Sequence, residues 1–169
     1  MRACGRHAPT GLRNRALIAL LYRAGLRINE ALSLYPKDLD LTDGCIRVLN
    51  GKGGRSRTVG LNPGAAAIIE RWLDVRSRLG LGGRHPVFCT LRGHPMAAAY
   101  VRVMLKRLAA RAGIDKRVHA RGLRHTHAAI REAHKKHKAN GTLADWESLE
   151  ALAGEVPPVE LAISHNAAR

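Results

Sequence analysis

The sequence predicts an α+β fold that is mainly α-helical and contains one small three-stranded antiparallel sheet. Three observations support this class. Apolar residues recur at helical spacing along most of the chain, first over residues 13–24. Turn signals at residues 42–44 and 50–54 divide an alternating apolar and polar stretch into short strands. The 169 residues are 46% hydrophobic, which is enough for one domain with a sizeable core.

Two helices and the sheet are expected in the first half of the chain. The helices cover residues 13–24 and 28–34. Gly25 ends the first helix in the left-handed conformation, and the second ends before Pro36, because the residue before a proline disfavours the helix. The strands lie within residues 39–49 and 58–61. The turn before the last strand places Lys52 at the tip of a hairpin.

The second half is expected to be almost entirely helical. Its helices are separated by glycine- or proline-containing turns and cover residues 62–79, 97–112, 122–138 and 142–153. Residues 80–86 form a loop, and the apolar residues 87–89 form a short buried strand. Residues 156–158 turn the chain into a short final segment that ends at Arg169.

The charge of the chain predicts a polyanionic partner. Lys and Arg number 29 against 13 Asp and Glu, a formal net charge of +16. Such an excess repels itself in a compact fold unless a partner neutralises it. Double-stranded DNA is favoured, because aromatic residues make up only 4% of the chain and offer few stacking platforms for single strands. A membrane is not expected as a partner, since no long basic amphipathic stretch has a large apolar face.

The cysteines and the N-terminal sequence predict a cytoplasmic protein associated with the nucleoid. Cys4, Cys45 and Cys89 are scattered and form no C-x-x-C pair. This spacing favours free thiols in a reducing compartment over a disulfide framework or a zinc finger. The first residues contain no apolar h-region, so no secretory signal is expected.

The first candidate site is the stretch from Gly25 to Glu30. Arg27 follows the glycine turn between two predicted helices, where a rigid base allows its guanidinium to clamp a phosphate in bidentate fashion. Glu30, three residues on, is placed to hold that guanidinium. The alternative is an ordinary surface Arg–Glu pair on a helix.

The second candidate site is the glycine-rich turn of residues 51–57. Lys52 at the hairpin tip can act as a phosphate contact or as a proton donor, and Arg55 and Arg57 follow it. The turn is not a Walker P-loop, because no Ser or Thr follows the lysine and the turn lies between strands. The alternative is a solvated basic turn.

The third candidate site spans residues 118–127, at the start of a predicted helix. Arg124 and the free amides of a helix N-terminus can grip a phosphate. The histidines could instead indicate a metal, but His125 and His127 are about 200° apart around a helix and share no face. No metal is therefore expected. An arginine- and lysine-rich run over residues 102–117 either extends this positive field or is a solvated helix face.

The order and spacing of the three sites resemble the catalytic domain of the tyrosine recombinases, the phage integrase family. Residues 14–32 look like the family's first arginine motif, with Arg27 as the first catalytic arginine. Lys52 matches the hairpin lysine, and residues 122–126 are similar to the second arginine motif, with Arg124 as the second. The resemblance covers residues 11–130 and implies the catalytic-domain fold of that family.

The resemblance implies site-specific DNA recombination or integration by transesterification. Two arginines stabilise the charge on the scissile phosphate, the lysine protonates the leaving 5′ oxygen, and a tyrosine forms a 3′-phosphotyrosyl link. Neither ATP, metal nor another cofactor is implied. The implied partners are double-stranded DNA and, on that DNA, a second copy of the chain or a full-length recombinase. Further DNA contacts are expected from Arg55, Arg57, His119, Arg121 and His125.

The sequence departs from the family pattern at three places. The family's histidine three residues before the second arginine is Arg121 here, and His119 is its candidate replacement. The third basic ligand falls on His165, unusually far after Arg124, with His134 and His137 as alternatives. The tyrosines all precede the second arginine motif, and none has the nucleophile's context; they are Tyr22, Tyr35 and Tyr100. A nucleophilic tyrosine would be expected beyond Arg169.

These observations leave three functional hypotheses. The first is a single catalytic-type domain over residues 1–169, without the N-terminal core-binding domain, with a divergent segment 139–169 and no strand cleavage on its own. The second is a non-catalytic DNA-binding remnant that competes with a full-length recombinase. The third is a basic RNA-associated protein, which leaves the coincidence of Arg27, Lys52 and Arg124 unexplained.

Overall fold

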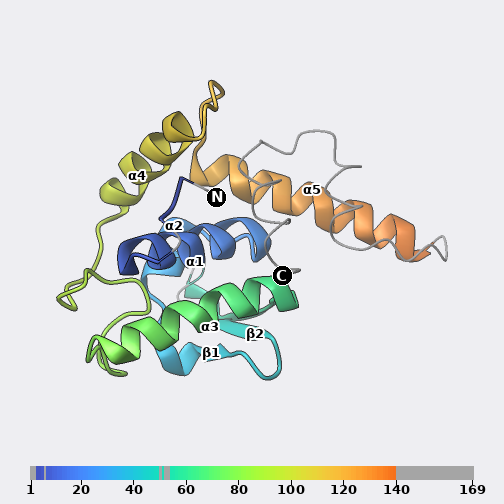
Figure 1. The fold of residues 1–169 in the computed structure, drawn as a ribbon. Coiled ribbons are helices and arrows are strands. Elements are labelled where there is room, and N and C mark those ends of the chain that lie inside the picture. The colour runs from blue at the N-terminus through green and yellow to red at the C-terminus, as the bar shows by residue number, and fades with distance from the viewer. Residues whose placement is uncertain (1–2, 6, 50, 52–53, 140–169) are drawn as a thin grey trace.

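The computed structural model describes residues 3–5, 7–49, 51 and 54–139, and these form a mainly helical domain with one small sheet (Figure 1). The helices are α1 (Pro9–Arg23), α2 (Ile28–Leu32), the 3₁₀ helix η1 (Pro36–Asp38), α3 (Pro63–Arg78), α4 (Ala98–Arg111) and α5 (Ala120–Ala139). The predicted fold class is confirmed. The expected helix at residues 142–153 lies outside the described residues.

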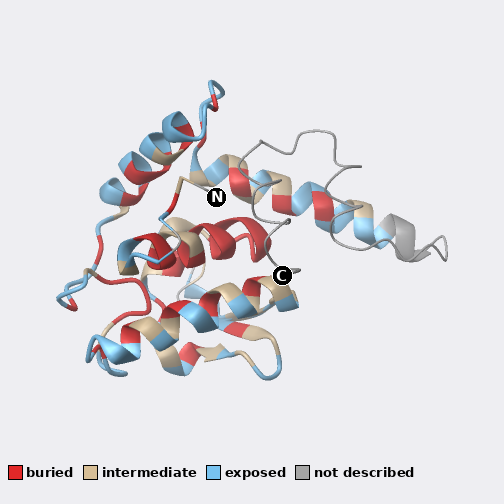
Figure 2. Cartoon of the chain, in the orientation of Figure 1, coloured by how far each residue is buried: buried red, intermediate tan, exposed pale blue. Residues whose placement is uncertain are grey.

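Helix α1 forms the centre of the core. Its residues from Ala16 to Tyr22 are almost completely buried, and Figure 2 shows the helix as mostly buried along its length. Helix α3 packs on α1 through the face that carries Ile69 and Trp72, and α5 packs on it through Leu123 and its neighbours. The helix starts earlier than predicted because Pro9 occupies its first turn, where the missing N–H is tolerated.

The sheet has the predicted three antiparallel strands in the order β1-β2-β3. The strands are β1 (Leu39–Asp40), β2 (Cys45–Val48) and β3 (Arg57–Gly60). Ile46 and Val48 of β2 are buried against the core, and Arg47 between them is exposed. Val48 pairs with Arg57, so β3 begins one residue earlier than predicted. Lys52, which falls between β2 and β3 in the sequence, lies outside the described residues.

The predicted buried strand at residues 87–89 is wrong. The segment is buried, but its one ladder contact is an isolated bridge from Cys89 to Pro95. Side chains, rather than a strand, hydrogen-bond its carbonyl groups: Trp72 Nε1 donates to Val87 O at 2.9 Å and Arg13 Nη1 donates to Cys89 O at 3.1 Å. The apolar run is therefore a covered loop: distant side chains satisfy two of its carbonyl groups, and the Val87 N–H donates to Leu34 O at 2.7 Å.

Local signals set the ends of the helices near the site. Asn62 caps α3 by accepting a hydrogen bond from the Ala65 N–H at 2.7 Å. Gly25 follows α1 with φ of +60°, the left-handed conformation expected from the sequence. Helix α5 begins at Ala120, two residues earlier than predicted, because His119 caps it. None of the helices in the described part of the chain is long and apolar enough to cross a membrane.

Candidate functional site

The carboxylate of Glu30 is the centre of the candidate site. Only 3% of its side chain is exposed. Arg27 Nη1 donates to Glu30 Oε1 at 2.7 Å, and the Arg27 backbone N–H donates to Oε2 at 2.9 Å. The second bond is the reach-back contact that an acidic residue makes in the first turn of a helix. Arg27 thus leaves the turn before α2 with its guanidinium already held, as predicted.

Two further arginines reach the same carboxylate from distant elements. Arg57 of β3 donates Nη1 to Oε1 at 3.0 Å and Nη2 to Oε2 at 2.8 Å, a bidentate pair. Arg124 of α5 lies with Nη1 3.7 Å from Oε2 and donates the same nitrogen to Gly25 O at 3.0 Å. We call Arg27, Arg57, Arg124 and Glu30 the arginine cluster.

A close contact between α5 and the end of α1 places Arg124 in the cluster. His127 is buried three residues further along α5, and its ring lies against Gly25. A Cβ at Gly25 would be 2.4 Å from His127 Cδ2, so only glycine allows this approach. The same glycine presents its carbonyl oxygen to Arg124. The turn therefore fixes both the backbone and the side chain of the second arginine motif.

The electrostatics of the cluster favour an anionic ligand. Burial alone raises the pKa of Glu30, but hydrogen bonds from Arg57 and Arg27 outweigh it and hold the pKa at about 2. Burial, and then repulsion from Arg27 and Arg57, lower the pKa of Arg124, while Glu30 opposes the shift. At neutral pH the cluster has three guanidinium groups for one carboxylate, and a bound phosphate relieves their repulsion.

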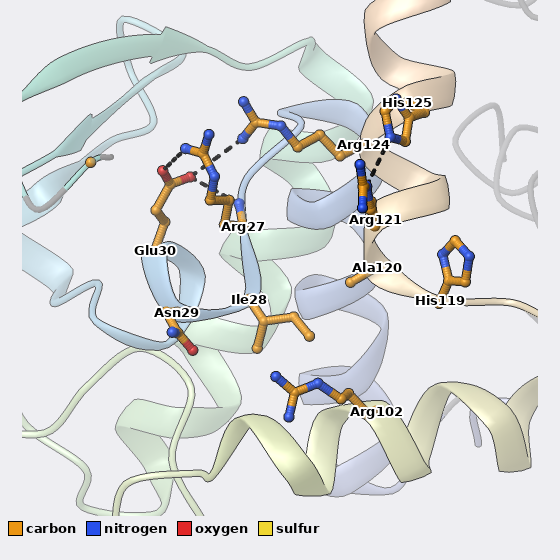
Figure 3. Close-up of a pocket in the computed structure, with 11 residues that line it drawn as sticks. Arg27, Ile28, Asn29, Glu30, Arg102, His119, Ala120, Arg121, Arg124 and His125 are labelled. Atoms are coloured by element: carbon orange, nitrogen blue, oxygen red, sulfur yellow. Dashed lines mark hydrogen bonds and ion pairs between the residues drawn. The ribbon is translucent and has the colours of Figure 1, made fainter. Parts of the chain in front are cut away.

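The cluster borders a cavity of about 710 Å³ between α2, α4 and the start of α5 (Figure 3). Arg27 and Arg124 line it, and their guanidinium groups point toward Glu30 at one end. Arg102 of α4 lines the same cavity from the opposite wall. The sequence analysis placed Arg102 only within a basic run. The signal for its exposure was its helical position, off the apolar face that carries the buried Val101 and Met104 of α4.

The histidines and the extra arginine at the start of α5 also line the cavity, and each ring is tied to a neighbour. His119 Nδ1 accepts a hydrogen bond from the Gly122 N–H at 2.8 Å, which leaves the proton of a neutral ring on Nε2. Arg121 Nε donates to His125 Nε2 at 3.3 Å. His119 therefore presents an N–H, a hydrogen-bond donor, rather than a basic lone pair.

The structure thus brings together most of the residues chosen from the sequence. The arginine cluster holds Arg27, Arg57 and Arg124, whereas Arg55 is exposed in the hairpin loop. Lys52 and His165 lie outside the described residues. His134, an alternative to His165, is exposed on α5 and does not line the cavity.

The tyrosines lie outside the cavity, and the described residues of metal-ligating type do not gather into a metal site. Tyr22 is buried in α1, Tyr100 receives a hydrogen bond from Arg13 at 3.4 Å, and neither they nor Tyr35 line the cavity. Within the described ranges, no three His, Cys, Asp or Glu side chains form a group that could hold a metal ion.

The arginine cluster places three guanidinium groups around one buried carboxylate, beside a basic cavity. Residues 1–140 match the phage integrase family, and the chain belongs to that family. The tyrosine recombinase XerC of Xylella fastidiosa is 41% identical over 121 residues, 72% of this chain and 40% of that protein. The tyrosine recombinase XerD of Ralstonia nicotianae is 40% identical over 124 residues. The chain spans about 40% of the length of these relatives.

Solved recombinase structures share the fold. The XerH site-specific recombinase bound to its difH substrate, in a pre-cleavage complex, aligns with 92% of this chain and 46% of that chain, with a TM-score of 0.61 and 29% identity. The XerA recombinase aligns with 96% of this chain and 55% of that chain, with a TM-score of 0.68 and 23% identity. The expected tyrosine-recombinase catalytic-domain fold is therefore confirmed.

Proposed function

We propose that this chain binds double-stranded DNA and grips one backbone phosphate between Arg27 and Arg124, as part of site-specific recombination. The observation that carries the proposal is the convergence of these guanidinium groups, from the α2 turn and from α5, at one carboxylate and one cavity. Such an arrangement binds a phosphate and stabilises the charge that develops on it during phosphoryl transfer. The net charge of +16 and the DNA-bound XerH relative support the same partner.

The proposed reaction is a phosphotyrosyl transesterification. A tyrosine hydroxyl loses its proton to a base, and its oxygen attacks the phosphate to form a 3′-phosphotyrosyl bond. The bond to the 5′ oxygen breaks, and that oxygen takes a proton from Lys52. Arg27 and Arg124 stabilise the negative charge, and His165 retains the role of third ligand that the family resemblance gives it. Rejoining needs no external energy source, because the phosphotyrosyl bond of the covalent intermediate preserves the energy of the broken DNA bond.

The source of the tyrosine separates two candidate functions. Tyr22, Tyr35 and Tyr100 do not line the cavity, so cleavage in this proposal needs a tyrosine that none of them provides. A full-length recombinase on the same DNA would be the partner that supplies it. Without such a partner, the second candidate is a non-catalytic protein that occupies recombinase sites through the same arginine cluster.

Duplex binding tests the proposal. Fluorescence anisotropy with a labelled DNA duplex is expected to show an affinity that falls by about 10³-fold or more between 50 and 200 mM salt if six or more phosphates are contacted. Arg124→Met is expected to weaken binding, whereas Arg71→Met, which removes an exposed arginine of α3 outside the cavity, serves as the matched loss of one charge.

Each outcome decides between named functions. A flat salt response, or equal affinities of the Arg124→Met and Arg71→Met variants, would refute a phosphate clamp. Tighter binding to an RNA duplex of the same sequence would favour the RNA-associated alternative. A covalent protein–DNA adduct on nicked DNA that survives denaturing electrophoresis, and that forms with this chain and a full-length recombinase together but with neither alone, would favour recombination over simple occupancy.

A further inference from the structure

We propose that Arg57 is a positioning residue for the phosphate clamp, which holds Glu30 and through it Arg27, and that it does not contact the phosphate itself. The inference rests on the proposed function of Arg27 and Arg124. It concerns a residue that the sequence assigned to direct DNA contact, together with Arg55.

The contacts of Arg57 are directed at the carboxylate. Both of its terminal nitrogens donate to Glu30, at 3.0 and 2.8 Å. The bidentate face of the guanidinium is therefore already used by the carboxylate. Arg27 and Arg124 line the 710 Å³ cavity, whereas Arg57 does not line it. Arg57 instead borders a smaller cavity of about 260 Å³, which Arg124, Arg131 and Lys135 also line. A phosphate bound in the larger cavity would therefore meet Arg27 and Arg124.

Arg57 also ties the hairpin loop to the cluster. A Cβ at Gly51 would lie 3.1 Å from Arg57 Nη1, so the loop backbone passes directly over this guanidinium. Gly51 lines the larger cavity. The Arg57 side chain of β3 thus contacts the Glu30 carboxylate, which orients Arg27, and lies beside Gly51, which forms part of the cavity wall.

The energetic role follows from the burial of Glu30. A carboxylate that is 3% exposed depends on its hydrogen bonds, and Arg57 supplies two of those that lower the pKa of Glu30. Without Arg57, Glu30 keeps the bonds from Arg27 but loses its support from the β3 side. The side chain of Arg27 is 41% exposed. Its orientation then depends on Glu30, whose side chain can itself change rotamer. Preorganisation of the clamp, rather than the number of cations, is what Arg57 contributes.

A double-mutant cycle on the full chain tests this role. Duplex DNA affinity is measured for the wild type, Arg57→Met, Glu30→Gln and the double variant, with Arg71→Met as the charge-matched control. Arg57→Met is expected to weaken binding about tenfold in the wild type and less than about twofold in the Glu30→Gln background. Equal tenfold losses in both backgrounds would mean that Arg57 acts on DNA independently of Glu30, which overturns the proposal.

Arg57→Lys separates geometry from charge. Lysine keeps the positive charge but cannot form the bidentate pair, so its affinity is expected to fall nearly as far as that of Arg57→Met. Recovery to the wild-type affinity would show that charge alone matters and would overturn the proposal.

A measurement on the free protein keeps this test separate from the proposed function. NMR relaxation of the Arg27 guanidinium reports its mobility without DNA. Its mobility is expected to rise in Arg57→Lys, and an unchanged mobility in a folded variant would overturn the positioning role. If the wild type showed no salt-dependent duplex affinity, the proposed function would fail, while this relaxation measurement would still decide whether Arg57 orders Arg27.

Discussion

Replacing Gly25 with alanine is expected to be among the most destabilising changes near the site. Gly25 has φ of +60°, and the added Cβ would lie 2.4 Å from His127 Cδ2. The left-handed conformation costs a non-glycine residue about 1–2 kcal/mol, and forcing an atom into a filled contact costs about 1–3 kcal/mol more. The free energy of unfolding should therefore fall by about 2–5 kcal/mol.

Gly113→Ala is the matched control for the backbone part of this cost. Gly113 also follows a helix, with φ of +69°, but a Cβ there would have no heavy atom within 4 Å. Urea unfolding of both variants, followed by circular dichroism, should give a loss of only about 1–2 kcal/mol for Gly113→Ala. In a His127→Ala background the cost of Gly25→Ala should fall to the same value, because the ring is gone.

Equal losses for Gly25→Ala and Gly113→Ala in the wild-type background would refute this reasoning. They would show that the ring of His127 moves away freely and that Gly25 is needed only for its φ. The two variants should also differ in DNA affinity, because Gly25 O accepts the hydrogen bond from Arg124 at 3.0 Å. Gly25→Ala is expected to weaken duplex binding, and Gly113→Ala to leave it unchanged.

Three further predictions concern buried polar groups. Burial, and then the charge of Arg131, lower the pKa of His127 from 6.5 to about 4. The free energy of unfolding should be highest above pH 6.5 and fall by about 3 kcal/mol as the pH drops toward 4. His127→Gln should remove this pH dependence in urea unfolding. Glu30, with a pKa of about 2 against 4.5, should lose its contribution, also about 3 kcal/mol, between pH 4.5 and 2, and Glu30→Gln should abolish that window. Arg76→Met should lower the thermal midpoint sharply, because the buried Arg76 donates to the carbonyls of Leu81 and Gly82.

The helices and the first arginine could be predicted because their signals are local. The apolar stripe of α1, the Asn62 cap of α3 and the Arg27–Glu30 pair each involve residues within one or two helical turns. Spacing along the chain therefore reports directly on spacing in space. The position of the hairpin was predictable for the same reason, since strand pairing across a short turn is local.

The rest depends on contacts between residues far apart in the sequence. Arg57 reaches Glu30 across 27 positions, and no periodicity distinguishes such an arginine from a solvated one. The apolar segment 87–89 predicts a strand, but in the structure Trp72 and Arg13 donate hydrogen bonds to its carbonyl oxygens. His127 belongs to the same charged run as Arg124, yet it is buried against Gly25 and does not line the 710 Å³ cavity.

The presence of arginine at position 121 separates the two parts of the expected chemistry. In the proposed clamp, Glu30 and Gly25 O hold Arg27 and Arg124 in place for phosphate binding. His119 and Arg121 do not offer a base in this arrangement, since His119 Nδ1 caps α5 and an arginine cannot act as a base at neutral pH. His119 could act as a base only by giving up its cap, and His125 Nε2 is already occupied by the hydrogen bond from Arg121. We therefore expect Arg27 and Arg124 to bind and polarise the phosphate, and the proton of an attacking hydroxyl to go to a group other than Arg121 and the capped His119.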